Sequence, residues 1–65
     1  MVELLRDGGT LIFPGTGLVF RVYKKERQMV LTNPEALRDP DSKDIFEKTK
    51  RVFRLALDYS VEVQQ

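Results

Sequence analysis

The sequence contains no cysteine, no histidine and no tryptophan among its 65 residues. Without cysteine or histidine it has no disulfide, no thiolate or imidazole metal ligand, and none of the nucleophile and base pairs that leave a recognisable pattern. Its two serines, Ser42 and Ser60, have no base near them in the sequence. We therefore expect a protein that is not an enzyme and that carries neither a metal ion nor another cofactor.

Excess charge and long apolar segments are also missing. Eleven basic residues oppose ten acidic ones, and this net charge of +1 is too balanced to predict binding to nucleic acid or to an anionic membrane by itself. No apolar run approaches the roughly 18 residues that span a bilayer, and Met1, Val2 and Glu3 do not resemble the start of a signal peptide. We expect a cytoplasmic protein without a membrane partner.

The length predicts a single domain that spans residues 1–65. A domain of this size removes only about 60% of its unfolded surface from water, so its margin of stability is small. Natural domains this short often gain stability from a disulfide, a metal ion or a partner subunit. With no cysteine or histidine present, a partner subunit is the expected device, either a second copy of the chain or another protein.

The clearest periodic signal lies in residues 41–59. Apolar and small side chains recur there at spacings of three and four, which predicts an amphipathic helix. Its predicted contacts with a sheet come from Ile45, Thr49, Val52, Phe53 and Ala56.

Three carboxylates, those of Asp39, Asp41 and Asp44, lie at the start of this helix. A calcium loop is not predicted, because Lys43 occupies a ligand position and the glycine of the sharp turn is missing. Helix capping by Asp39 or Asp41 explains the carboxylates better.

Alternating apolar and polar residues predict strands in the first half of the chain. Residues 2–6 and 10–13 flank Asp7 and Gly8, a pair of residues suited to a hairpin turn. Residues 18–24 and 28–32 form a second predicted hairpin with a four-residue loop. The segment 14–17 between the two hairpins is predicted to be a turn and not a phosphate-binding loop, because no helix follows it.

In the second hairpin, Val22 is expected opposite Met29 and Phe20 opposite Leu31. After it, residues 32–35 predict a short helical turn capped by Thr32 or Asn33, and residues 61–63 predict either a last strand or a frayed end. The expected fold class is α+β: a small antiparallel sheet of two β-hairpins packed on one long C-terminal helix.

One helix covers only one face of such a sheet. The opposite face is expected to carry a row of branched and aromatic side chains, either a protein-binding patch or scattered residues that favour strands. The five candidate protein-binding residues are Leu5, Ile12, Val19, Tyr23 and Val30. The sequence thus predicts a protein-binding or regulatory module that works as a homodimer or as a small subunit of an assembly.

A second hypothesis is nucleic-acid binding. Basic and aromatic residues alternate near the tip of the second hairpin, a pattern that single-strand binders use for phosphate contacts and base stacking. The candidate residues are Arg21, Tyr23, Lys24, Lys25 and Arg27. Lys50, Arg51 and Arg54 of the helix are additional candidates.

Overall fold

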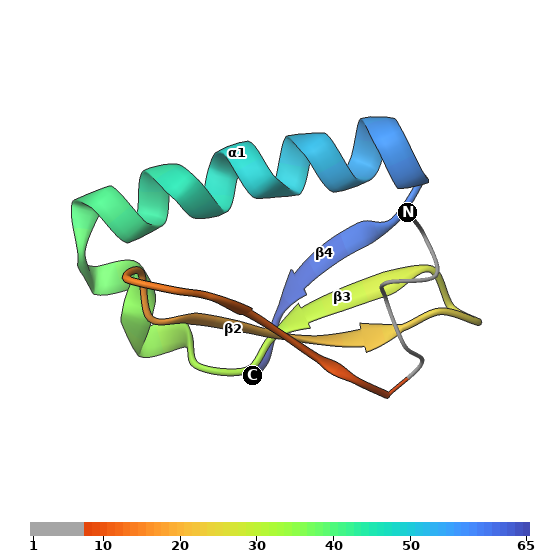
Figure 1. Ribbon diagram of the computed structural model, residues 1–65, viewed down its shortest axis with the longest axis horizontal. Coiled ribbons are helices and arrows are strands. Elements are labelled where there is room, and N and C mark those ends of the chain that lie inside the picture. Colours follow the sequence, from red (N-terminus) through yellow and green to blue (C-terminus); the bar gives the residue numbers. More distant parts are fainter. Residues whose placement is uncertain (1–7) are drawn as a thin grey trace.

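The computed structural model describes residues 8–65 as a four-stranded sheet with one long helix lying along one of its faces (Figure 1). The α+β fold class is confirmed. In chain order the elements are β1 (Thr10–Phe13), β2 (Leu18–Tyr23), β3 (Gln28–Leu31), the 3-10 helix η2 (Pro34–Arg38), α1 (Pro40–Leu57) and β4 (Ser60–Val63).

Strand β1 pairs with β2, antiparallel, with Leu11 opposite Phe20. The segment 14–17 is the turn between these two strands. The Thr16 hydroxyl donates to the Phe13 carbonyl oxygen at 2.7 Å and accepts from the Leu18 amide at 3.1 Å, which closes the turn. The prediction placed this segment between two separate hairpins. In the structure it is instead the turn of a single hairpin formed by β1 and β2. The predicted partner of β1, residues 2–6, lies outside the described residues, as does Leu5.

The second predicted hairpin is confirmed in its register. Val22 lies opposite Met29 and Phe20 opposite Leu31. The four-residue turn 24–27 closes with the Arg27 amide donating to the Lys24 carbonyl oxygen at 3.1 Å.

Strand β4 pairs with β3 in parallel, so the sheet is mixed and the prediction of a purely antiparallel sheet was wrong. The reason is the length of α1: 18 residues rise about 27 Å, enough to carry the chain back along the whole sheet. Strand β4 therefore starts at the same end as β3, as in a strand–helix–strand unit.

Capping explains how α1 begins. The Asp39 side chain accepts a hydrogen bond from the Asp41 amide at 3.1 Å, as predicted. Asn33 occupies the N-cap position of η2 ahead of Pro34, as one of the two predicted alternatives had it, but its side chain makes no capping hydrogen bond. It binds β2 instead, accepting from the Val19 amide at 3.1 Å and donating to the Gly17 carbonyl oxygen.

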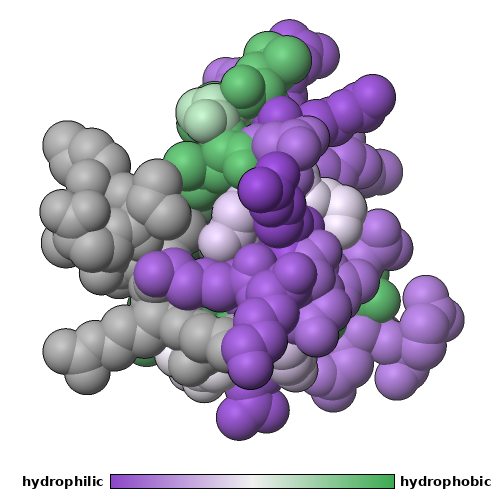
Figure 2. Space-filling model, turned by 90° about the vertical axis from the view of Figure 1, so that its right-hand side faces the viewer, coloured by the Kyte–Doolittle hydropathy of each residue, from purple (hydrophilic) through white to green (hydrophobic). Residues whose placement is uncertain are grey.

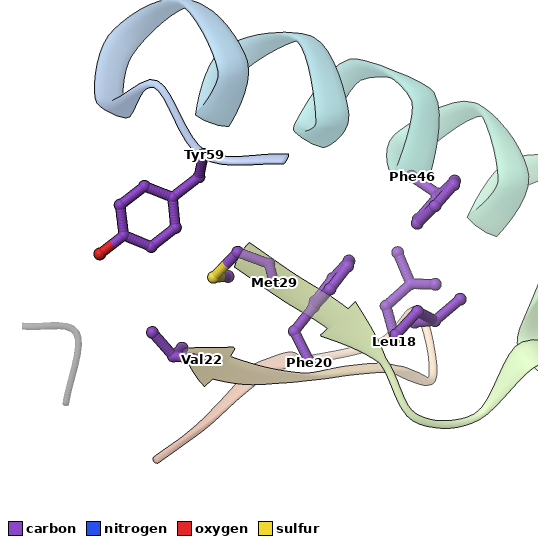
Figure 3. Packing of buried hydrophobic residues seen from close by; sticks show 7 residues of the cluster. Leu18, Phe20, Val22, Met29, Phe46 and Tyr59 are labelled. Atoms are coloured by element: carbon purple, nitrogen blue, oxygen red, sulfur yellow. The ribbon is translucent and has the colours of Figure 1, made fainter. Parts of the chain in front are cut away.

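The core lies between α1 and the sheet (Figure 3). Phe46 of α1 stacks on Phe20 of β2, with ring centroids 6.0 Å apart, and Phe13 of β1 meets Phe20 edge-on at 5.5 Å. Tyr59, two residues after the end of α1, lies at the other end of the cluster, where Met29 and Val22 also lie (Figure 3). The buried apolar residues are Leu18, Phe20, Val22, Met29, Leu31, Phe46 and Tyr59.

Helix α1 is rotated relative to the prediction. Its buried residues are Ser42, Phe46 and Thr49, whereas Val52 is 57% exposed and Ala56 is exposed. Successive helical residues are about 100° apart, so a stripe centred on residues 42, 46 and 49 turns Val52 to the side of the helix. The buried Ser42 hydroxyl donates to the Thr16 carbonyl oxygen at 2.7 Å and ties α1 to the first turn.

Candidate protein-binding surfaces

The first candidate surface is the sheet face opposite α1, here called the outer face. Figure 1 shows the long helix on the other side of the sheet only. Because strand side chains alternate, the residues between the buried ones point to the outer face. Four of the five predicted protein-binding residues share this face: Ile12, Val19, Tyr23 and Val30.

Ile12 and Val19 lie directly opposite each other on β1 and β2. Ile12 is 62% exposed, while Val19, Tyr23 and Val30 are half-buried. Each of these side chains therefore retains apolar surface in contact with water. Neighbouring strands are about 4.8 Å apart, so the four residues lie close enough to form one patch.

Charged residues lie within and beside this patch, since Arg21 lies between Val19 and Tyr23 on the outer face of β2. The register of the sheet places Thr10, Arg21, Val30 and Glu62 in one row across the four strands. Arg21 and Glu62 thus flank Val30, each about one strand spacing away. Opposite charges lie on either side of an apolar centre, and both charged side chains are exposed.

A second apolar surface, which the sequence did not predict, lies where α1 overhangs β1. Phe13, Ile45, Thr49, Val52 and Phe53 line an open groove of about 360 Å³, with Lys48 at its rim. The prediction missed this groove because it assigned Val52 to the core.

Leu55, 80% exposed, adds to the apolar surface of the helix. Figure 2 shows hydrophobic side chains gathered at the top of the molecule, over α1, above a mostly hydrophilic surface. A signal for this surface is present in the sequence, since Leu55 follows Val52 by three residues and both are large and apolar.

The opposite side of α1, toward β4, is basic. Lys50 and Arg54 line a groove of about 280 Å³ together with Ser60, Val61 and Glu62. The Lys50 ammonium lies 3.2 Å from a Glu47 carboxylate oxygen and 5.4 Å from the centre of the Phe46 ring. The helix therefore has an apolar side toward β1 and a basic side toward β4.

The predicted nucleic-acid residues lie on two successive parts of the second hairpin. Arg21 and Tyr23 lie on the outer face, whereas Lys24, Lys25 and Arg27 lie in the turn 24–27. Arg27 forms an ion pair with Asp58 at 3.1 Å across an exposed part of the surface.

Arg27 and Arg54 line one hollow near this turn, but so do two carboxylates, those of Glu26 and Asp58. The charge in this hollow is consequently mixed. Phosphate contacts are made by basic side chains, and in this hollow two carboxylates lie beside the two arginines.

Within residues 8–65 there is no group of three or more acidic side chains placed to hold a metal ion, and no helix is long and apolar enough to cross a membrane. No protein-family model, curated protein or solved structure matches the chain. The function is therefore inferred from the chain's own surfaces.

Proposed function

We propose that this chain is a small, non-enzymatic protein-binding module that associates with a second copy of itself through the outer face of its sheet. The observation that supports this proposal is the single helical layer: α1 packs on one face, and the other face carries Ile12, which is 62% exposed, and the half-buried Val19, Tyr23 and Val30. A sheet with antiparallel strand pairs, such as β1–β2 and β2–β3 here, tolerates one solvated face, but that face is then normally polar. A sheet face with this many apolar side chains on a chain this small is instead typical of an interface.

The arrangement of charge favours a second copy as the partner. In a face-to-face pair whose two-fold axis lies between the two sheets and parallel to β3, Val30 meets its own copy at the centre and Tyr23 faces Ser60 of the other copy. Arg21 and Glu62 lie on opposite sides of Val30 in the same row, so each Arg21 then lies opposite a Glu62 of the other copy. Such self-complementarity is what a symmetric dimer interface requires.

The size of the face indicates a modest affinity. Four strands about 4.8 Å apart and a few residues long give a patch near the lower limit of stable interfaces, which bury about 1,200 Å² in total. We therefore expect a dimer with a dissociation constant in the micromolar range, about 1–100 µM. A small subunit of a larger assembly, the other form of the prediction, would use the same face.

The test compares two substitutions that each add one positive charge in place of an apolar side chain. Val30→Lys places an ammonium at the centre of the proposed interface and should abolish dimerisation. Leu55→Lys, on the exposed side of α1, is the matched control and should leave dimerisation unchanged. If both variants dimerise like the wild type while remaining folded, the outer face is not the interface.

A charge-reversal pair tests the same geometry independently of apolar contacts. Arg21→Glu and Glu62→Arg should each weaken the dimer, and the double variant should restore most of the loss because the ion pairs are re-formed in reverse. A double variant weaker than both single variants would contradict the proposed two-fold arrangement.

A further inference from the structure

The free edge of β4 lies apart from the outer face. Within residues 8–65, β4 has a strand partner on one side only. The amides of Ser60 and Gln64 both donate toward β3, at 2.9 Å, to the carbonyl oxygens of Arg27 and Leu31. Because the backbone groups of successive residues point to alternate edges of a strand, every second residue between Ser60 and Gln64 directs its amide and carbonyl groups to the free edge. These outward residues are Val61 and Val63.

Two basic side chains, Lys50 and Arg54, lie on the helix side of this edge, and the Lys50 ammonium is also 3.2 Å from a Glu47 carboxylate oxygen. Val61 and Val63 point toward the helix side of the sheet, where Lys50 and Arg54 line the adjoining groove. Glu62 points to the outer face. A strand added at this edge would therefore meet positive charge on its helix side and negative charge on its other side.

This pattern argues against a second copy as the occupant. An antiparallel pair of β4 strands related by a two-fold axis would bring the α1 helices of both copies alongside each other at the junction. Lys50 and Arg54 would then approach the same residues of the other copy, and like charges this close are repulsive.

We propose that the β4 edge binds an extended acidic peptide segment of another protein, which adds as a fifth, antiparallel strand. Residues of the segment opposite Val61 and Val63 project toward Lys50 and Arg54 and are acidic. Residues at the alternate positions lie on the side of Glu62 and are not acidic. Backbone hydrogen bonds supply affinity, and the alternation of charge supplies specificity. This proposal goes beyond self-association and does not depend on it.

The experiment is an NMR titration of the full chain with two short synthetic peptides of identical composition. One alternates glutamate and threonine; the other carries the same glutamates in one block. The alternating peptide should bind more tightly, and it should slow amide hydrogen exchange at Val61 and Val63, whose N–H groups gain acceptors. Ser60 and Gln64 already donate to β3 and serve as internal controls.

Charge variants identify the recognition site. Arg54→Glu should weaken binding of the alternating peptide at least about tenfold, whereas Arg38→Glu, the same charge change on the exposed end of η2, should change it less than about twofold. The Val30→Lys variant, which disrupts the proposed dimer, should bind the peptide as the wild type does. This outcome separates the two proposals, because either can fail alone.

Three results would overturn the β4 proposal. The first is equal affinity for the alternating and block peptides, which would mean attraction to basic charge without strand pairing. The second is unchanged exchange at Val61 and Val63 with a saturating peptide. The third is a short single-stranded RNA that shifts the resonances of Lys50 and Arg54 more strongly than the peptide does, which would assign the basic side of α1 to phosphate.

Discussion

Replacing Asn33 with alanine should lower the free energy of unfolding by more than is usual for a substitution in a connecting segment. Its side chain joins the start of η2 to the start of β2, through one bond from the Val19 amide at 3.1 Å and one to the Gly17 carbonyl oxygen. Alanine removes both partners and leaves the backbone groups in place. The Val19 amide and the Gly17 carbonyl oxygen therefore each lose a hydrogen-bond partner from the protein.

The magnitude follows from the exposure of each group. Val19 is half-buried, so loss of the acceptor for its amide is expected to cost about 1–2 kcal/mol. Gly17 is exposed, so water replaces the lost donor at little cost. A total near 1.5 kcal/mol is a large share of the roughly 3–10 kcal/mol expected for a domain of this length.

Urea unfolding followed by far-ultraviolet circular dichroism measures this loss. With a slope of about 1 kcal/mol per molar urea for so small a domain, the midpoint should fall by about 1.5 M. Asn33→Asp keeps the acceptor for the Val19 amide and should lose less than Asn33→Ala. Glu35→Ala, on the exposed surface of η2, is the control and should change the free energy of unfolding by less than about 0.5 kcal/mol. Equal midpoints for Asn33→Ala and Glu35→Ala would refute this reasoning.

Two further predictions concern α1 and the turn 24–27. Val52→Ser and Leu55→Ser should each change the free energy of unfolding by less than about 0.5 kcal/mol, whereas Phe46→Ala should cost about 3–5 kcal/mol. A large loss of stability in Val52→Ser would mean that Val52 faces the sheet, as the sequence predicted. Fluorescence titration with a short single-stranded RNA at low salt should show no binding that depends on charge. Binding whose logarithm falls linearly with the logarithm of salt concentration, and that is lost when Arg21, Lys25 and Arg27 are neutralised together, would instead support the nucleic-acid hypothesis.

Local patterns predicted the elements whose partners lie close in sequence. The β2 and β3 register followed from Phe20 and Val22 facing Leu31 and Met29, because a shift by one residue would turn every apolar side chain to the other face. The Asp39 cap followed in the same way, since its partner, the Asp41 amide, lies two residues away.

The features that the sequence did not predict depend on contacts between residues that are distant in the chain. The parallel pairing of β4 requires the full length of α1 and the left-handed backbone of Asp58, at φ 60°, that ends the helix. The rotation of α1 is coupled to the Ser42 hydroxyl binding the Thr16 carbonyl oxygen, 26 residues earlier in the chain. Periodicity alone predicts that a helix has an apolar side, not which residues at the boundary of that side meet the sheet. For this reason Val52 was assigned to the core and the groove beside β1 was missed.

The most direct test of the proposed function is analytical ultracentrifugation of the wild type and of Val30→Lys, from about 1 µM to about 1 mM, a range that brackets the expected dissociation constant. The wild type should pass from monomer to dimer as concentration rises. Val30→Lys should remain a monomer throughout while its circular dichroism spectrum matches that of the wild type. A wild type that is still monomeric at the highest concentration would contradict self-association through the outer face.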